Sequence, residues 1–268
     1  MSGFDPEWLA LREPADAAAR SLRLTRLVAD VLSQASVRAV DLASGTGANV
    51  RHLAPHLPMV HDWLVVEHDP QLVARALATA GRPVVARCVD LDPEAGGPPP
   101  ELFEGRDLVT ASALLDLVSE RWIEAMIARC REAGAVVLFA LTYNGEIRCA
   151  PRDADDDSIR DLVNEHQRSD KGFGPALGPA SAVYASECLT AHGYCVERDE
   201  SPWTLTPDRA ELQRRLIAGW AEAASEIAPT RARSIASWRD RRMAHVAAGE
   251  SRLIVGHEDV AAWLPHSP

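Results

Sequence analysis

The sequence has 268 residues, with 39 acidic and 28 basic side chains and a formal net charge of −11. This length suits one large domain, and the acidic balance argues against nucleic acid or an anionic membrane surface as the main partner. No apolar run approaches the ~18 residues of a membrane-spanning helix and no leader pattern opens the chain, so we expect a cytoplasmic protein. The five cysteines and nine histidines show neither C-x-x-C nor H-E-x-x-H spacing, which argues against a disulfide frame or a metal site.

The N-terminal segment carries apolar residues at helical spacing between positions 6 and 34. This pattern predicts one or two helices, divided at Pro14. Three charged side chains, Arg12, Asp16 and Arg20, lie along the segment. We expect these residues to form a helical cap over the domain.

Residues 37–50, VRAVDLASGTGANV, combine a short buried strand, an acid at its end and a glycine-rich turn into a helix near Ala48. Glycines there let the backbone approach a ligand closely, and the helix N-terminus offers free N–H groups. The dinucleotide fingerprint G-x-G-x-x-G fails because Val50 occupies its third small position. A phosphate-binding P-loop fails too, because no Lys-Ser/Thr pair follows the glycines.

Two further strands also end in acids. The segment HDWLVVE ends in Glu67, about twenty residues past the glycine turn, where a carboxylate can accept both hydroxyls of a ribose. Asp69 is the nearby alternative. The next strand, at 83–89, is followed by Asp90. Three acids at three successive strand ends are unlikely to occur by chance.

These features resemble the class I S-adenosylmethionine-dependent methyltransferases. Motif I of that family reads D-x-G-x-G-x-G, and the run from Asp41 to Gly47 departs from it only at Ala43. The resemblance covers residues 37–142 well and the remainder by topology alone. It implies an α/β fold with a doubly wound, mostly parallel seven-stranded sheet, helices on both faces and a reversed last strand. It also implies S-adenosyl-L-methionine as cofactor and S-adenosyl-L-homocysteine as product. The implied cofactor-binding residues are Asp41, Ala43, Ser44, Gly45, Gly47, Asn49, Glu67 on the ribose, His68, Asp90 and Leu91 on the adenine, and Ser112 and Leu114.

The second half predicts strands at 107–112, 135–142, 194–197 and 252–257, and helices at 181–191, 209–227 and 229–248. The last two helices exceed what a minimal methyltransferase needs. Asp116, just past the fourth strand, is placed to touch either ligand. A late arginine cluster, expected to be a solvated helical face, comprises Arg231, Arg233, Arg239, Arg241 and Arg242.

We divide the single methyltransferase domain into an N-terminal helical cap (1–35), a cofactor-binding half (36–142), an inserted lid or acceptor loop (143–180) and a C-terminal half with extra helices (181–268).

The insertion at 143–180 predicts a helix at 159–166 and then a glycine-rich loop, HQRSDKGFGPALGP. Lys171 is the only lysine among the 28 basic residues, which suggests that a compact ammonium is wanted there. We interpret the loop as an acceptor lid with His166 as candidate general base and Tyr143 and Lys171 beside it. A solvated surface loop is the alternative.

Methyl transfer from a sulfonium is an in-line displacement that requires positioning and exclusion of water but no metal. We therefore expect an enzyme acting on a small-molecule acceptor, as a monomer or a homodimer. The alternatives are a methyltransferase for RNA or protein, and a non-catalytic S-adenosylmethionine-binding regulatory protein. A-S-A-L after the fourth strand, in place of N-P-P-Y, argues against amino methylation of nucleic acid. A dehydrogenase with an altered fingerprint is the remaining alternative.

Overall fold

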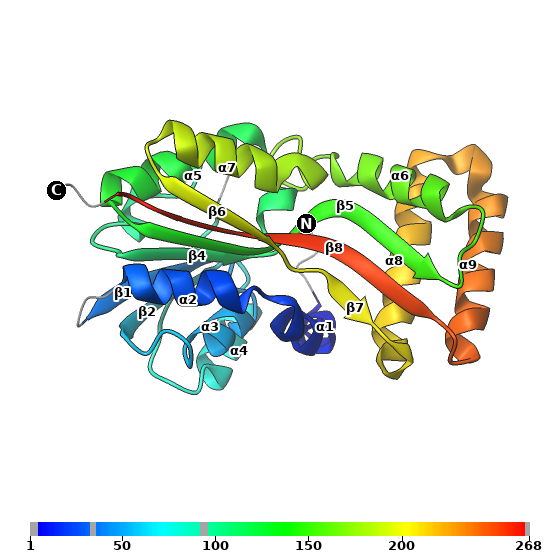
Figure 1. Ribbon diagram of the computed structural model, residues 1–268, viewed down its shortest axis with the longest axis horizontal. Helices are drawn as coiled ribbons and strands as arrows, with labels where there is room; N and C mark the ends of the chain where they lie inside the picture. The colour runs from blue at the N-terminus through cyan, green and yellow to red at the C-terminus, as the bar shows by residue number, and fades with distance from the viewer. Residues whose placement is uncertain (1–4, 33–35, 92–95, 266–268) are drawn as a thin grey trace.

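The computed structural model describes residues 5–32, 36–91 and 96–265, and contains a sheet of eight strands (Figure 1). The strand order is β3-β2-β1-β4-β5-β8-β6, with β7 paired to β8. The strands are β1 Val37–Leu42, β2 Val60–Glu67, β3 Val85–Cys88, β4 Leu108–Ser112, β5 Val136–Ala150, β6 Cys195–Glu200, β7 Trp203–Leu205 and β8 Arg252–Trp263. The helices are α1 Pro6–Ala19, α2 Leu22–Val31, α3 Ala48–Leu53, α4 Pro70–Thr79, α5 Glu120–Ala133, α6 Asp156–Gln167, α7 Ser181–Ala191, α8 Ala210–Ile227 and α9 Ala232–Ala247.

The sheet is parallel from β3 through β5, and β8 runs antiparallel to its three neighbours. Side chains alternate between the two faces along each strand. In β1, Val40 and Leu42 pack on the face covered by α5 and α7, whereas Val37 and Ala39 pack on the face covered by α2 and α3 (Figure 1). The predicted doubly wound α/β sheet, mostly parallel with a reversed last strand, is confirmed. It has eight strands instead of seven, because β7 was not recognised.

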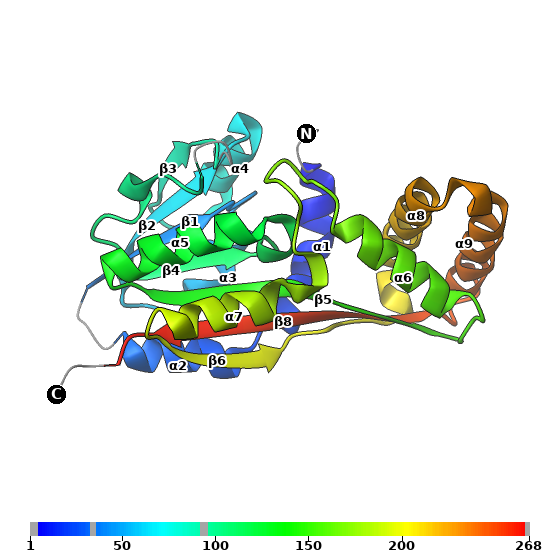
Figure 2. The same cartoon turned by 90° about the horizontal axis from the view of Figure 1, so that it is seen from above.

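A long arm of β5 and β8 extends beyond the body of the sheet and carries α6, α8 and α9 at its end (Figures 1 and 2). The predicted end of the fifth strand at residue 142 is wrong, because residues 143–150 pair with residues 252–257 of β8. The last strand is longer than predicted for the same reason. The end of the arm has a separate hydrophobic core that contains Ile147, Val163, Trp220, Trp238 and Leu253. Helices α6, α8 and α9 therefore pack around a hydrophobic core of their own at the end of the arm.

The N-terminal helix α1 continues through Pro14, so the predicted break at that proline is wrong. The chain leaves the helix only at Arg20, whose backbone is extended. There Ser21 begins α2, because its hydroxyl oxygen accepts a hydrogen bond from the N–H of Leu24 at 3.1 Å. The side-chain cap, and not the proline, therefore divides the two helices.

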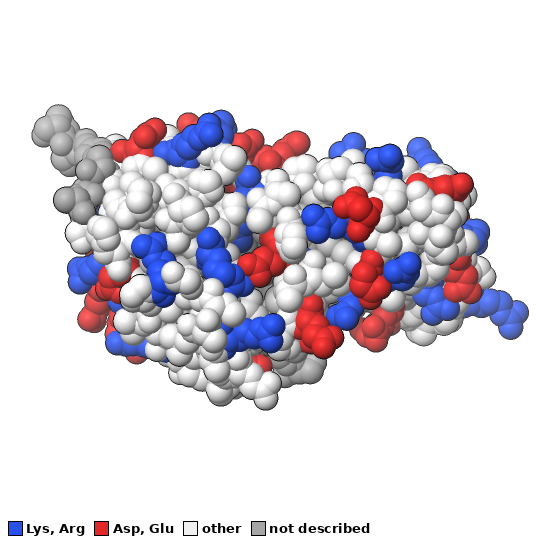
Figure 3. Space-filling view, turned by 90° about the horizontal axis from the view of Figure 1, so that it is seen from below, with Lys and Arg blue, Asp and Glu red and all other residues white. Residues whose placement is uncertain are grey.

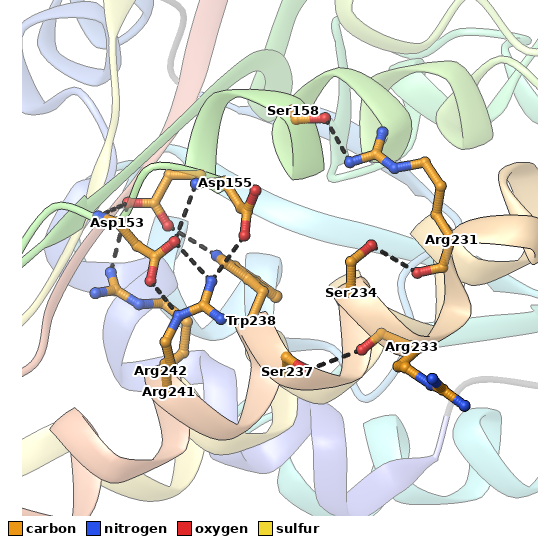
Figure 4. Close-up of polar contacts among 11 residues, drawn as sticks. Asp153, Asp155, Ser158, Arg231, Arg233, Ser234, Ser237, Trp238, Arg241 and Arg242 are labelled. Atoms are coloured by element: carbon orange, nitrogen blue, oxygen red, sulfur yellow. Dashed lines mark hydrogen bonds and ion pairs between the residues drawn. The ribbon is translucent and has the colours of Figure 1, made fainter.

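The arginine cluster of α9 is only in part a solvated face. Arg241 forms an ion pair with Asp153 at 2.6 Å, which lowers the pKa of that carboxyl to about 2. Arg242 is 1% exposed, and Trp238 donates its indole N–H to Asp156 at 2.9 Å. Figure 4 shows these contacts joining α9 to the start of α6. The remaining members, Arg231, Arg233 and Arg239, are exposed.

Acidic and basic side chains are mixed over the surface seen in Figure 3. Surface ion pairs such as Arg23 with Asp199 and Arg106 with Asp62 place opposite charges side by side. In the ranges that the structure describes, no helix combines the length and apolarity needed to span a membrane.

Candidate functional site

A pocket lies at the carboxyl ends of β1, β2 and β4, with α1 forming one of its walls. Parallel α/β sheets bind ligands at this edge. Nine of the twelve predicted cofactor residues line the pocket, namely Asp41, Ala43, Ser44, Gly45, Asn49, Glu67, His68, Ser112 and Leu114. Lys171 also lines it. The lining also contains residues that were not predicted to belong to the site, among them Leu9, Arg12, Asp16, Arg20, Leu117 and Phe173.

The glycine turn between β1 and α3 has an unusual backbone. Gly45 has φ +54° and Gly47 has φ +78°, both in the left-handed region that glycine adopts most readily. Ala43, at the position of the missing motif glycine, has φ +50° and so adopts the same conformation at a cost of roughly 1–2 kcal/mol. A side chain on Gly47 would lie 3.3 Å from the Cβ of Ala76, so Gly47 allows close packing on α4 but does not line the pocket.

The carboxylate of Glu67 joins the two turns that bound the pocket. Its Oε2 accepts a hydrogen bond from the N–H of Gly45 at 2.8 Å, and its Oε1 accepts one from the N–H of His68 at 2.8 Å. The residue is only 5% exposed. A carboxylate oxygen can accept two hydrogen bonds, so Oε2 retains capacity for a ligand hydroxyl.

A buried polar chain runs from Asp41 toward α1. Oδ1 of Asp41 accepts hydrogen bonds from the Nδ2 of Asn49 at 2.5 Å and from the hydroxyl of Thr110 at 2.7 Å. Its Oδ2 has no hydrogen-bond partner among the described residues. Burial raises the pKa of Asp41, although these hydrogen bonds oppose the shift. The carboxylate therefore has an unsatisfied oxygen at the pocket.

Arg20 continues this chain from the end of α1. It donates hydrogen bonds to Asn49 and, at 2.9 Å, to the hydroxyl of Ser112, while its Nε has no partner in the described part of the chain. The residue is 7% exposed, and burial lowers its pKa. It forms no salt bridge with any described residue, so a buried guanidinium lacks a directly paired anion. The sequence analysis placed Arg20 in the N-terminal helical segment, but nothing in the neighbouring residues predicted its contact with Ser112, 92 residues away.

Helix α1 is held in place by Trp203 of β7. Arg12 donates to Asp16 at 2.9 Å and lies over the Trp203 ring, 4.9 Å from its centroid. Asp16 accepts a hydrogen bond from the indole N–H at 3.1 Å. A side chain on Gly45 would meet Leu9 of α1 at 3.4 Å. The helix therefore lies directly against the glycine turn.

Among the three residues predicted on the acceptor side, only Lys171 reaches the pocket. Tyr143 belongs to β5, and its hydroxyl donates to Asn164 at 2.7 Å. Burial raises the pKa of that hydroxyl. His166, on α6, contacts the Lys171 amine and does not line the pocket.

The predicted adenine residues Asp90 and Leu91 also lie outside the pocket lining. Leu91 is 4% exposed within the main core, and its carbonyl accepts the Trp122 indole N–H at 3.1 Å. The adjoining residues 92–95 lie outside the described ranges. The adenine contact therefore stays a prediction.

Asp116, in the short 3-10 helix Leu115–Leu117, provides a pH test of the region beside the pocket. Burial raises its pKa to about 6, against the opposing charge of Arg12, and its Oδ1 has no partner among the described residues. Because the folded state disfavours the ionised form, it binds the Asp116 proton more tightly than the unfolded state does. This tighter binding stabilises the fold fully below about pH 4, and the contribution is lost as the pH rises through about 6. We expect the contribution of Asp116 to the free energy of unfolding to fall by about 2 kcal/mol between pH 4 and pH 7. Urea unfolding of wild type and Asp116→Asn across this range measures it, and equal pH dependence of the two proteins would contradict the assignment.

No protein-family model and no curated protein matches the sequence. The structure is similar to a candidate methyltransferase of Bacillus halodurans C-125, with a TM-score of 0.51 and 11% identity, over 92% of this chain and 100% of that one. The cyclopropane synthase MmaA2 of Mycobacterium tuberculosis gives a TM-score of 0.48 and 13% identity, over 89% of this chain and 82% of that one. An S-adenosylmethionine-dependent methyltransferase of Thiobacillus denitrificans, in complex with S-adenosyl-L-homocysteine, gives a TM-score of 0.48 and 12% identity, over 98% of this chain and 99% of that one. The chain has the class I, Rossmann-like methyltransferase fold, and at these identities the likeness extends to the fold alone.

Proposed function

We propose that this protein is an S-adenosyl-L-methionine-dependent methyltransferase that acts on a small-molecule acceptor. The observation that carries the proposal is that Asp41 and Arg20, two buried charged residues, line one pocket with Glu67 and each keep one polar atom without a partner among the described residues. A buried polar atom of a charged group is costly to leave without a partner, and a ligand can supply that partner. A ligand with one cationic and one anionic group beside a ribose would satisfy all three residues.

The methionine part of the cofactor carries both groups. Its α-ammonium would be held by Oδ2 of Asp41, and its α-carboxylate by the remaining N–H donors of Arg20. A ribose hydroxyl would be held by Oε2 of Glu67, which already accepts the Gly45 N–H. A nicotinamide dinucleotide has a pyrophosphate that could pair with Arg20, but it has no ammonium group for Oδ2 of Asp41.

The bound cofactor would supply an activated methyl group, so the protein's task is to orient the acceptor and keep water away. Leu9 of α1, Leu117 and Phe173 provide apolar walls on the pocket. Helix α1 lies over the glycine turn and is anchored through Trp203. A pocket covered in this way supports a small acceptor over a segment of a macromolecule. We further propose that the loop around Lys171 belongs to the acceptor lid.

Calorimetric titration of the purified protein with S-adenosylmethionine, S-adenosylhomocysteine and NAD tests the proposal. We expect micromolar binding of both sulfur compounds and no binding of NAD. Folded protein that binds neither sulfur compound would exclude the methyltransferase function, and binding of NAD in their place would indicate a dehydrogenase. Transfer of label from methyl-labelled cofactor to small-molecule acceptors then separates an enzyme from a non-catalytic binding protein.

A further inference from the structure

Three side chains from three separate segments connect the pocket with the outer surface of α8. The Nζ of Lys171, in the glycine-rich loop, lies 3.3 Å from the Nδ1 of His166 at the end of α6. The Nε2 of the same imidazole lies 3.0 Å from the Oε2 of Glu226 on α8. Lys171 lines the pocket, whereas the Glu226 side chain is 62% exposed. The contacts therefore run from the pocket wall to solvent.

The hydrogen-bond partners determine the protonation pattern of this chain. A carboxylate accepts, so Glu226 holds the proton of His166 on Nε2 and leaves a lone pair on Nδ1. That lone pair faces the amine of Lys171, which also donates to the hydroxyl of Ser169 at 2.8 Å. A proton that passes from Lys171 to His166 would give an imidazolium directly beside the Glu226 carboxylate. The carboxylate stabilises that charge, so the three side chains form a continuous path for a proton from the pocket to the surface.

The surroundings of Lys171 make its amine easier to deprotonate than that of an exposed lysine. Burial lowers the pKa of Lys171, and the charge of Glu226 opposes this shift. The other charged or titratable groups that line the same pocket are Arg12, Asp16, Arg20, Asp41, Glu67 and His68. No salt bridge joins Lys171 to a carboxylate within the described ranges. Its amine is thus available to a ligand on one side and to His166 on the other.

We propose that Lys171 removes a proton from the acceptor and that His166 and Glu226 form a relay that carries this proton to the surface. The inference rests on the proposed methyltransferase function and deepens it. The nucleophilic oxygen or nitrogen of the acceptor forms a bond to the methyl carbon, the carbon–sulfur bond breaks and its electron pair stays on sulfur. The proton of the acceptor passes to Nζ of Lys171, then to Nδ1 of His166, while the proton on Nε2 passes to Glu226 and on to solvent.

The relay defines a substrate class. The acceptor is a small molecule with an apolar body, suited to Leu9, Leu117 and Phe173, and its nucleophilic atom carries a proton as O–H or N–H. Lys171 is the catalytic residue of this step because it lines the pocket. His166 and Glu226 act through Lys171 and are positioning residues.

The single lysine makes the relay directly measurable. Protein labelled with [13Cε]lysine gives one lysine signal, whose shift against pH reports the ionisation of Lys171. We expect a pKa below that of an ordinary lysine in the wild type and a still lower one in Glu226→Gln, because the opposing carboxylate charge is lost. Glu226→Asp should restore the wild-type titration. Glu222→Gln is the matched control, since it removes the same charge one turn earlier on α8 from an exposed side chain.

A double-mutant cycle separates the relay from a simple effect of distant charge. In the background of His166→Phe, Glu226→Gln should lower the pKa of Lys171 less than it does in the wild type, because only the direct charge effect remains, and an equal change in both backgrounds would overturn the relay. An ordinary lysine titration in the wild type, or equal titrations in wild type and Glu226→Gln, would overturn the relay.

Adding S-adenosylhomocysteine to the same sample keeps the two proposals apart. If this compound binds and Lys171 titrates as an ordinary lysine, the relay alone is wrong. If Lys171 is coupled to Glu226 but the compound does not bind, the methyltransferase function is wrong, and with it the acceptor chemistry assigned to the relay.

Discussion

Replacing Glu67 with alanine should weaken the binding of S-adenosylhomocysteine about 100-fold or more. A hydrogen bond to a charged group contributes about 1.5–3 kcal/mol, and Oε2 of Glu67 is proposed to accept one from the ribose. Loss of about 3 kcal/mol corresponds to roughly a 100-fold change in dissociation constant. The change also removes the acceptor for the N–H of Gly45, which further disturbs the turn. Calorimetry on the wild type and the variant measures the effect.

The matched control is Asp69→Asn, at the other acid that the sequence placed near the ribose. Asp69 caps α4 by accepting the N–H of Gln71 at 2.8 Å, and asparagine preserves such a cap. We expect its affinity for S-adenosylhomocysteine to match the wild type. Glu67→Gln, which retains the shape of the side chain, guards against a loss caused by misfolding. Wild-type affinity in a folded Glu67→Gln protein, together with loss of affinity in Asp69→Asn, would show that Asp69 and not Glu67 binds the ribose.

Replacing Arg20 with methionine should weaken S-adenosylhomocysteine binding by about 10- to 100-fold while changing the affinity for 5′-methylthioadenosine little. The two compounds share the adenosine and the sulfur, but only the first carries the amino-acid end that Arg20 is proposed to hold. One charged hydrogen-bonding interaction of about 1.5–3 kcal/mol accounts for that range. The ratio of the two affinities is therefore the quantity to measure.

The control for this prediction is Arg23→Met, which makes the same change at an exposed arginine that pairs with Asp199 away from the pocket. It should leave both affinities and their ratio unchanged. If Arg20→Met lowers the affinity for both compounds equally, Arg20 supports the site through Asn49 and Ser112 and does not bind the carboxylate. An unchanged ratio in a folded variant would thus refute the assignment.

Several elements of this fold could be predicted because their signals are local. The buried strand before the glycine turn appears as β1, and the predicted helix at 181–191 coincides with α7 Ser181–Ala191. Hydrophobic periodicity over one element requires no knowledge of the rest of the chain. The same holds for the acids at strand ends, since parallel strands bring their carboxyl ends to one edge. Asp41 and Glu67 accordingly line one pocket.

The far half of β5 could not be predicted in the same way. Its sequence, TYNGEIRCA, contains an Asn-Gly pair and alternating polar residues, which are typical of a turn or an exposed segment. It becomes a strand because β8 supplies partners for it, such as His257 for Tyr143. Half-buried strands depend on such distant pairing more than on intrinsic preference.

Local sequence is therefore enough to predict the α/β class, the glycine turn and the acids at the strand ends, because each depends on neighbouring residues and on the geometry of parallel strands. Two contacts became apparent only in the folded chain: Arg20 completes the pocket, and Glu226 meets His166, 60 residues away. Such contacts arise from the packing of α1 on β7 and of α6 on α8. They carry no periodic signal in the chain, since a side chain's partner across a fold is set by where whole elements pack.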